Sequence, residues 1–425
     1  MSVVFLIVVL FALLILGAPV AIALGVSALL TTIFFTSHDI LAMPEMMVAG
    51  LKPALMAIPM FVLAGLLMSR GGSAGRIIDF AKSLVGHLPG GLPISAILAC
   101  VIFAAISGSS PATVIAIGSV MFAALKQANY PNSYAIGAIT SAGALGILIP
   151  PSITMIVYGV TGEVSIEKLF MAGVVPGVMI AVIMMLYAYV GARRLGFKAT
   201  KSAGIKEQTR QFKKSFWALL IVFVVIGGIY VGVFTATEAA GISAVYALVI
   251  SLFVYKDLKF KELYSVFLEA AITTAQLFLI IGFAVVFAHF LTSERIPHMI
   301  AEALVSMDMT WWMFLILVNI TLFFMGQFME PSSIVMIMTP LLLPIAVALG
   351  IDPVHFGIIM VVNMEIGMLT PPIGLNLFVA SSLTGLSMKE VTISVFPWLV
   401  LFVICLLLIT YIPQISLFLP NLLGR

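Results

Sequence analysis

Two short polar runs interrupt apolar stretches of this sequence, and each run is followed at a similar spacing by a double proline. The runs are Ser-Gly-Ser-Ser-Pro-Ala at 107–112 and Met-Glu-Pro-Ser-Ser at 329–333, and the double prolines lie at 150–151 and 371–372. Because proline has no backbone N–H, it breaks a helix and leaves carbonyls exposed at one helix end and N–H groups at the next. Such carbonyls, with hydroxyls, suit a hard cation such as Na⁺, whereas a helix N-terminus suits a carboxylate.

The two polar runs and the two breaks predict a pair of related Na⁺ sites with an anionic substrate between them. Several ligands would contribute only a backbone oxygen. The first predicted Na⁺ site consists of Ser107, Gly108, Ser109, Ser110, Gly143, Gly146, Ile149 and Pro150. The second consists of Gly326, Met329, Glu330, Ser332, Gly367, Met368 and Thr370. The candidate polar contacts for the substrate are Ser110, Ser333, Thr154 and Asn376. We expect no cofactor and no metal ion other than Na⁺ as coupling ion.

A simpler interpretation treats these features as proline kinks whose hydroxyls bond back to their own helix, as serine and threonine often do in membranes. Because the two polar runs match each other and the two double prolines also match, we favour the binding sites over simple proline kinks. Below, the turn at each polar run is called a tip and the interruption at each double proline a break. Glu330 and Glu365 lie within apolar stretches, where an acid is costly and usually functional. For both acids we favour a supporting role, such as accepting hydrogen bonds from exposed N–H groups, over binding a cation or proton.

The elements that must position these residues are membrane helices. Of the 425 residues, 63% are hydrophobic and 9% charged, whereas soluble domains carry about 25% charged residues. The mean hydropathy of +1.26 excludes a water-soluble globule. Apolar stretches long enough for helical spans fill most of the chain, and the alternating pattern of barrel strands is missing. We therefore predict an all-α polytopic membrane protein, with no nucleic-acid partner.

The distribution of charge orients the helices. The stretch 193–214 carries eight basic residues and one acid, which places it in the cytoplasm by the positive-inside rule. This stretch could bind anionic membrane lipids or serve as a solvated linker. Both termini then lie in the periplasm, and the pairs at 91–126 and 310–350 become re-entrant hairpins. The predicted crossings are 2–16, 18–35, 55–69, 132–159, 168–192, 216–234, 236–254, 275–291, 355–384 and 390–418.

The landmarks repeat once along the chain. Gly146 to Ser152 (Gly-Ile-Leu-Ile-Pro-Pro-Ser) and Gly367 to Ile373 (Gly-Met-Leu-Thr-Pro-Pro-Ile) stand 221 residues apart. The copies face opposite ways across the membrane, which is an inverted-topology repeat typical of secondary transporters. The first half, 1–215, comprises scaffold helices 1–69, hairpin 91–126, broken helix 132–159, helix 168–192 and a basic cytoplasmic linker 193–215. The second half, 216–425, comprises scaffold helices 216–291, hairpin 310–350, broken helix 355–384 and helix 390–418.

Four motifs resemble the large membrane subunit of tripartite ATP-independent periplasmic (TRAP) transporters. They are S-G-S-S-P-A at 107–112, G-I-L-I-P-P-S at 146–152, E-P-S-S at 330–333 and G-M-L-T-P-P-I-G-L-N at 367–376. The resemblance covers essentially the whole chain. It implies a Na⁺-driven importer of carboxylates, such as C4-dicarboxylates or sialic acid, in the bacterial inner membrane. It also implies an elevator fold, in which a domain holding both hairpins and both broken helices slides against a scaffold.

The resemblance further implies two protein partners: a small four-helix membrane subunit, and a soluble periplasmic protein that binds and delivers the substrate. Some relatives fuse the small subunit at the N-terminus. Because nothing precedes Met1 to play that role, we expect the small subunit to be a separate chain.

Three alternatives remain at the level of sequence. A standalone divalent-anion/Na⁺ symporter would share the hairpins and the repeat but need no binding protein. An intramembrane serine hydrolase could use Ser109 as nucleophile and His289 as base, but it needs the two within hydrogen-bond reach and has no use for a duplicated motif. A passive channel would ignore the Na⁺ gradient. We expect no enzymatic activity.

Overall fold

The computed structural model describes residues 2–35, 42–296, 299 and 309–423. Within these residues the chain forms helices and no β-strand, which confirms the all-α class. The N-terminal half contains α1 (Ser2–Ile15), α2 (Val20–Phe35), α3 (Met43–Ala49), the 3₁₀ helix η2 (Pro53–Met56), α4 (Ala57–Arg70), α5 (Ser73–Val85), α6 (Gly91–Ser107), α7 (Ser110–Gln127), α8 (Asn132–Ala144), the 3₁₀ helix η3 (Leu145–Ile147), α9 (Ile153–Thr161) and α10 (Ile166–Arg194).

The C-terminal half follows a related order. It contains α11 (Gly204–Tyr230), α12 (Ala236–Val249), the π-helix η4 (Ile250–Val254), α13 (Phe260–Ser293), α15 (Trp311–Gly326), α16 (Pro331–Ala348), α17 (Pro353–Met368), α18 (Leu375–Thr384), α19 (Met388–Tyr411) and α20 (Gln414–Leu423). In each half a helical pair precedes a broken helix: α6 and α7 precede α8 and α9, and α15 and α16 precede α17 and α18.

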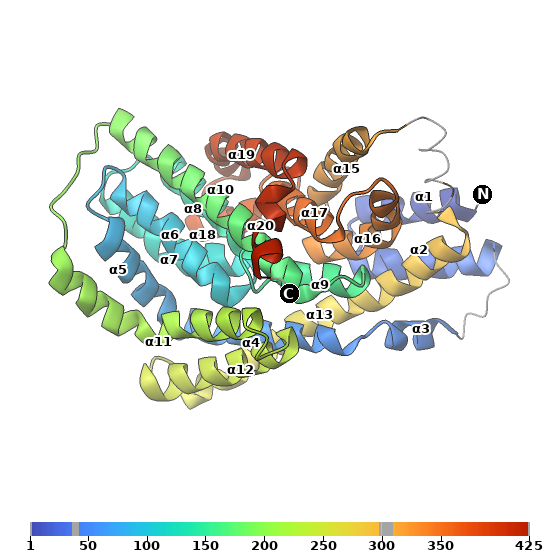
Figure 1. The fold of residues 1–425 in the computed structure, drawn as a ribbon, viewed down its shortest axis with the longest axis horizontal. Coiled ribbons are helices and arrows are strands. Elements are labelled where there is room, and N and C mark those ends of the chain that lie inside the picture. The colour runs from blue at the N-terminus through green and yellow to red at the C-terminus, as the bar shows by residue number, and fades with distance from the viewer. Residues whose placement is uncertain (1, 36–41, 297–298, 300–308, 424–425) are drawn as a thin grey trace.

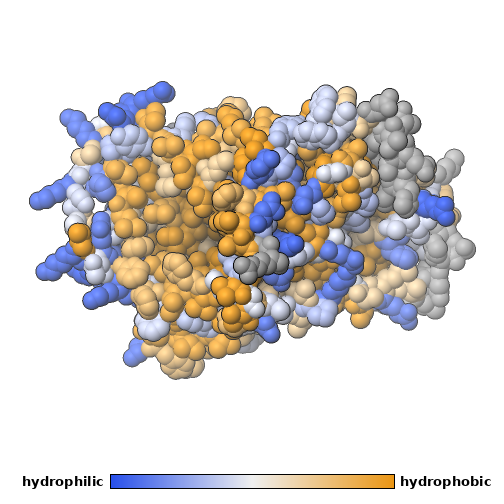
Figure 2. Space-filling model, viewed as in Figure 1, coloured by the Kyte–Doolittle hydropathy of each residue, from blue (hydrophilic) through white to orange (hydrophobic). Residues whose placement is uncertain are grey.

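Seven helices of the described chain are long and apolar enough to cross a membrane, so the protein is polytopic. Ten crossings are predicted from the sequence. Six of these ten fall on the long helices, and the other four consist of shorter helices, α1 and α2, or of broken ones, α8 with α9 and α17 with α18. The seventh long helix is α16, which lies in the predicted re-entrant hairpin 310–350. A broad apolar band covers the middle of the molecule, and hydrophilic residues gather at the end where the loop between α10 and α11 lies (Figures 1 and 2).

Several helices begin at side chains that cap their exposed N–H groups. Thr235 and Glu238 form a reciprocal capping box at α12, and Ser387 and Glu390 form another at α19. Asp352 accepts hydrogen bonds from two backbone N–H groups of α17. These local signals explain why the helices start at these residues, since each cap satisfies N–H groups that lack an intrahelical partner.

The structure corrects the predicted bounds in two places. The stretch 193–215 is not a linker throughout: α10 continues to Arg194 and α11 begins at Gly204. Lysine, glutamate and glutamine favour helix, and Glu207 accepts hydrogen bonds from Arg210 and Gln211 one turn away. The predicted last helix, 390–418, ends at Tyr411, and α20 is separate, because Pro413 cannot continue the backbone ladder.

The two halves interlock. Helix α16 of the second pair packs against α9 of the first broken helix, and α18 of the second broken helix packs against α7 of the first pair. Figure 1 shows the α6–α7 pair and the α15–α16 pair on opposite sides of the molecular centre. Helices α4 and α13 contact each other and lie along these elements. The residues of each tip are therefore surrounded by elements from both halves.

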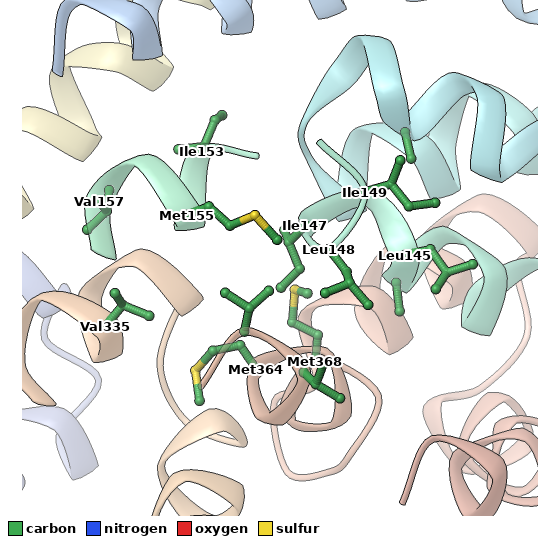
Figure 3. Close-up of a cluster of buried hydrophobic side chains, with 14 of the residues drawn as sticks. Leu145, Ile147, Leu148, Ile149, Ile153, Met155, Val157, Val335, Met364 and Met368 are labelled. Carbon is green, nitrogen blue, oxygen red and sulfur yellow. The ribbon is translucent and has the colours of Figure 1, made fainter. Parts of the chain in front are cut away.

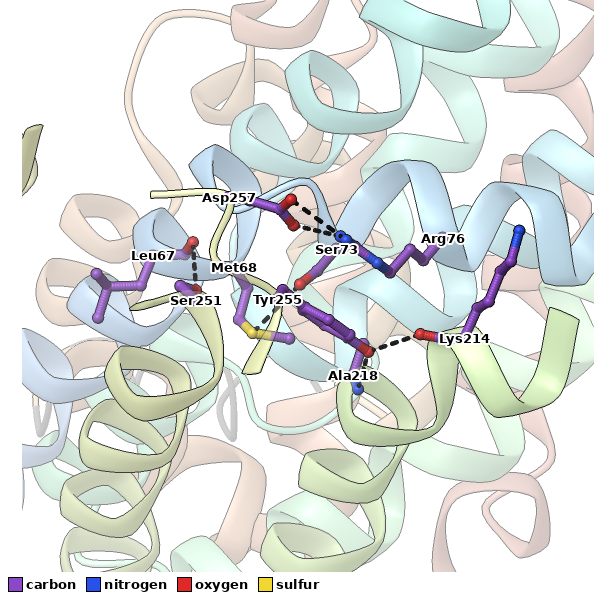
Figure 4. A network of polar contacts seen from close by, with 9 residues as sticks. All are labelled: Leu67, Met68, Ser73, Arg76, Lys214, Ala218, Ser251, Tyr255 and Asp257. Atoms are coloured by element: carbon purple, nitrogen blue, oxygen red, sulfur yellow. Dashed lines mark hydrogen bonds and ion pairs between the residues drawn. The ribbon is translucent and has the colours of Figure 1, made fainter. Parts of the chain in front are cut away.

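A polar network joins the start of α5 to the segment between η4 and α13 (Figure 4). Arg76 pairs with Asp257 and lies over the ring of Tyr255, with its guanidinium carbon 3.9 Å from the ring centroid. The Tyr255 hydroxyl accepts a hydrogen bond from the Ala218 N–H and donates one to the Lys214 carbonyl. A separate ion pair joins Lys52, before η2, to Glu163, in the loop after α9. The hydrogen bond and the charge of Lys52 lower the pKa of Glu163.

We expect Gly137→Ala to destabilise the contact between α8 and α19. A Cβ atom there would lie 2.3 Å from the Ser394 carbonyl oxygen and 2.5 Å from Trp398 Nε1. Overpacking of this kind costs about 1–3 kcal/mol, so the thermal unfolding midpoint in detergent should fall by several degrees. Gly227→Ala is the matched control, because nothing lies within 4 Å of its Cβ position. Equal midpoints for the two variants would contradict this packing.

Candidate functional site

The first tip is the turn between α6 and α7. Gly108 has a φ of +59°, which ends α6 in the left-handed conformation that glycine adopts without strain. Ser109 is extended, and Pro111 stands in the first turn of α7, where its missing N–H costs nothing. The hydroxyl groups of Ser107 and Thr113 lie 2.9 Å apart, and Thr113 also donates to the Ser109 carbonyl. The tip is therefore a compact turn rich in oxygen atoms.

The first break separates α8 from α9. The turn after η3 contains the cis Pro150-Pro151 peptide and ends at Ser152. The Ser152 hydroxyl donates to the Ile147 carbonyl at 2.5 Å and accepts from the Met155 N–H at 3.3 Å. One side chain thus satisfies groups from both sides of the break.

The first tip and the first break are in direct contact. The Ile153 N–H donates to the Gly108 carbonyl at 3.5 Å, and the Ser110 hydroxyl donates to the Gly143 carbonyl at 3.0 Å. Gly146 lies so close that a Cβ atom would stand 2.6 Å from the Ser109 carbonyl oxygen. Only glycine permits this approach, which brings backbone oxygens of the tip and the break together.

The second tip lies between α15 and α16, and Glu330 organises it. Its carboxylate accepts hydrogen bonds from the Ser333 N–H at 3.2 Å, the Ser332 hydroxyl at 2.9 Å and the Ser333 hydroxyl at 3.3 Å. Glu330 is thereby the N-cap of α16. A carboxyl group of the protein itself already caps this helix N-terminus and accepts a hydrogen bond from a backbone N–H, which is the kind of supporting role expected for Glu330.

The second break separates α17 from α18 and repeats the arrangement of the first. It contains the cis Pro371-Pro372 peptide, and the Ile373 N–H donates to the Gln327 carbonyl at 3.2 Å. A Cβ atom on Gly326 would lie 2.9 Å from the Gly367 Cα atom. Thr370 follows the end of α17, and its hydroxyl donates back to the Ile366 carbonyl of that helix, as the proline-kink interpretation expects.

A hydrogen bond connects the second break to the first tip. The Asn376 side-chain amide donates to the Ser110 hydroxyl at 2.6 Å, and both residues are buried. Ser110 therefore links three interrupted elements, because it also donates to the first break. Behind these polar groups, Ile147, Leu148 and Met155 pack toward Met364 and Met368 of α17 (Figure 3).

A cavity of about 510 Å³ lies where these elements meet. Both tips contribute to its lining, and so do one face of α4 and one face of α13. Seven predicted Na⁺ ligands line it: Ser107, Gly108, Ser109, Ser110, Glu330, Ser332 and Met368. The other eight do not: Gly143, Gly146, Ile149, Pro150, Gly326, Met329, Gly367 and Thr370. Of the candidate substrate contacts, Ser110 and Thr154 line the cavity, whereas Ser333 and Asn376 do not.

Residues that were not among the candidate ligands also line the cavity. Arg70 at the end of α4 pairs with Glu269 of α13, and their nearest nitrogen and oxygen atoms are 2.5 Å apart. Glu269 shares one face of α13 with Thr273 and Gln276, at spacings of four and three residues. From the sequence, Arg70 only marks a basic loop. In the sequence, the helical spacing of Glu269, Thr273 and Gln276 indicates that the three share one face of a helix. It does not indicate whether that face borders a cavity.

The helix N-termini around the cavity differ in how they are capped. Glu330 caps α16 and Ser152 caps α9, whereas no side chain caps α7 or α18. Ser110 of α7 and Leu375 of α18 both line the cavity. An uncapped N-terminus attracts anions, so the cavity offers a favourable environment for a carboxylate.

Glu365 is fully buried on α17, and neither of its carboxylate oxygens has a hydrogen-bond partner among the described residues. It therefore differs from Glu330, which has three hydrogen bonds. His289, the base of the hypothetical serine hydrolase, does not line the cavity with Ser109.

The apolar helices, the paired breaks and the central cavity define a polytopic membrane protein with a cavity between its two halves. Residues 7–415 match the family described as "Tripartite ATP-independent periplasmic transporter, DctM component". The chain is 48% identical over 430 residues to the C4-dicarboxylate TRAP transporter large permease protein of Rhodobacter capsulatus, covering 98% of both chains. It is 36% identical over 407 residues to the sialic acid TRAP transporter large permease protein of Vibrio cholerae, covering 96% of this chain and 95% of that one. This protein belongs to the TRAP transporter family, as a large permease component.

A solved structure has a similar fold. The Alcanivorax borkumensis YdaH transporter superposes with a TM-score of 0.59 and 14% identity, covering 87% of this chain and 86% of that one. At this identity the likeness concerns the fold alone. It agrees with the all-α polytopic architecture.

We expect Ser110 and Asn376 to be energetically coupled. Removing one partner leaves a buried polar group unpaired, at a cost of about 1–3 kcal/mol. In a double-mutant cycle of Ser110→Ala and Asn376→Ala, the double variant should be more stable than the sum of the single effects implies. Ser381→Ala is the control on the same helix, since its hydroxyl bonds to the Leu386 carbonyl and its effect should add to that of Ser110→Ala. Denaturant unfolding in detergent gives the free energy of unfolding of each variant. If the effects of Ser110→Ala and Asn376→Ala on that free energy simply add in the double variant, the coupling is refuted.

Proposed function

We propose that this protein carries out Na⁺-coupled uptake of a small carboxylate, of the C4-dicarboxylate or sialic acid class, across the bacterial inner membrane. The observation that carries the proposal is that both tips line one cavity, each in contact with its own broken helix. The Rhodobacter relative is named for C4-dicarboxylates and the Vibrio relative for sialic acid. Both substrates carry a carboxylate.

The coupling ions would bind behind the substrate, where each tip meets its break. The backbone oxygens around Gly143 and Gly146 suit one Na⁺, and those around Gly326 and Gly367 suit the other. Gly146, Gly326 and Gly367 lie against the opposite backbone too closely for a side chain, and Gly143 lies against Val114. A cation bound there would hold the tip against the break. The substrate would then bind well only while the cation is present, and this would couple substrate uptake to Na⁺.

The movement we propose is an elevator motion. The two tips and two broken helices would form the moving body, and α4 and α13 would belong to the scaffold. The contacts of α16 with α9 and of α18 with α7 support one body, because each pair joins elements from different halves. The basic loop between α10 and α11 would lie in the cytoplasm, and both termini in the periplasm.

The family is tripartite, and we propose that this chain works with two partners: a small four-helix membrane subunit and a periplasmic binding protein that delivers the substrate. The apolar outer surface of the helices would contact lipid. A standalone symporter is the alternative. Uptake into proteoliposomes with and without the binding protein distinguishes the two, and full activity without it would favour the standalone symporter.

The coupling ion is tested with succinate uptake into proteoliposomes containing this chain and its small subunit, with the binding protein outside. An inward Na⁺ gradient should drive accumulation, and replacing Na⁺ by choline should abolish it. Uptake that is equal in choline would reject Na⁺ coupling and favour a passive channel.

Thr370→Ala should raise the Na⁺ concentration for half-maximal uptake by about tenfold, because the residue adjoins the second break. Its hydroxyl bonds back to the carbonyl four residues earlier, as does that of Thr384 on α18. Thr384→Ala is therefore a matched control that loses the same kind of hydrogen bond away from the break. Equal Na⁺ dependence in the two variants would argue against a cation near Thr370.

A further inference from the structure

Arg70 and Glu269 form an ion pair at the edge of the cavity. Nη2 of Arg70 lies 2.5 Å from Oε2 of Glu269, and the side chains are 49% and 44% exposed. Among the described residues, Arg70 is the only basic side chain that lines the cavity. A cavity that accepts an anionic substrate thus contains one guanidinium, and an acid of the protein occupies it.

The position of Arg70 relates it to the first tip. Helix α4 touches this tip at Gly65, where a Cβ atom would lie 3.1 Å from the Ser107 Cα atom. Arg70 follows five residues later, about 7.5 Å further along the helix axis. Gly65, Ser69 and Arg70 all line the cavity. The backbone of Arg70 therefore lies one to two helical turns along α4 from the contact with the tip, and its side chain lines the same cavity.

The chemistry of the pair permits exchange. A guanidinium has five donors in a planar fork and binds carboxylates with two parallel hydrogen bonds. A half-exposed ion pair is weak, because water screens the charges and the side chains lose freedom. An incoming carboxylate can take the place of Glu269 with little net cost, since one carboxylate replaces another at the same donors.

We propose that Arg70 binds a carboxylate group of the substrate, and that Glu269 holds the guanidinium in place until the substrate displaces it. This inference rests on the proposed carboxylate transport. Glu269 is then a resident competitor: it keeps the arginine extended into the cavity when the cavity is empty, and it limits the affinity for the substrate. A displaced Glu269 also repels the bound anion, which favours release.

The two partners of the pair therefore have opposite expected effects. Arg70→Gln should weaken succinate binding by about tenfold, through loss of a charge-assisted hydrogen bond. Glu269→Gln should strengthen binding by about three- to tenfold, because the competing charge is gone. The double variant should resemble Arg70→Gln. An ion pair with only a structural role predicts the same direction for both single variants.

The measurements are the succinate dissociation constant in detergent with Na⁺ present, and the half-saturation of uptake in the three-component proteoliposomes. Arg76 and Asp257 provide the matched control. They also form an ion pair, between α5, which follows α4, and the segment before α13, but neither residue lines the cavity. Arg76→Gln and Asp257→Asn should leave the succinate affinity of the folded protein unchanged. Thermal unfolding of every variant identifies effects on folding.

Weaker binding in both Arg70→Gln and Glu269→Gln, or unchanged binding in either, would overturn the inference while leaving carboxylate transport intact. Wild-type protein that takes up neither succinate nor N-acetylneuraminate in the complete system would overturn the proposed function and the inference with it. Opposite shifts in the two variants, with unchanged controls, would establish the exchange.

Discussion

The constraint on which this structure depends is that a broken helix inside a membrane cannot leave its backbone groups unpaired, since each such group costs several kcal/mol. The chain meets this constraint by pairing each break with a tip. Ile153 donates to the Gly108 carbonyl in the first half, and Ile373 donates to the Gln327 carbonyl in the second. Ser152 and Glu330 satisfy further groups through their side chains. Neither tip nor break would be stable alone, so their association follows from the interruption itself.

The two halves solve this problem with different side chains. At the second tip the side chain of Glu330 caps the N-terminus of α16, whereas no side chain caps α7 at the first tip. Asn376 of the second half donates a hydrogen bond to Ser110 of the first, and residues of both tips line the cavity, so the two halves form it jointly. A repeated framework thus produces an asymmetric cavity, with one helix N-terminus capped by a side chain and another left without such a cap.

Much of the fold follows from local signals. Proline pairs and serine–glycine runs within apolar stretches mark the tips and breaks, because several residues that disfavour a helix interior stand together there. The helix bounds predicted from the sequence were wrong where the local residues are compatible with more than one structure. Basic residues from 204 onward resemble a polar linker in composition, yet lysine, glutamate and glutamine also form helix readily. The last helix ends at Tyr411 because Pro413 outweighs the apolar character that continues beyond it.

The sequence by itself determined the class of protein, the positions of the four interruptions and the candidate oxygen ligands, because hydropathy and proline chemistry act over a few residues. Only the tertiary structure decided which of those ligands face the cavity, that Ser333 and Asn376 are turned to internal partners, and that Arg70 meets Glu269 nearly 200 residues away. Such contacts depend on how helices from both halves pack. Helical periodicity specifies a face of each helix, but the neighbour on that face is set by the whole fold.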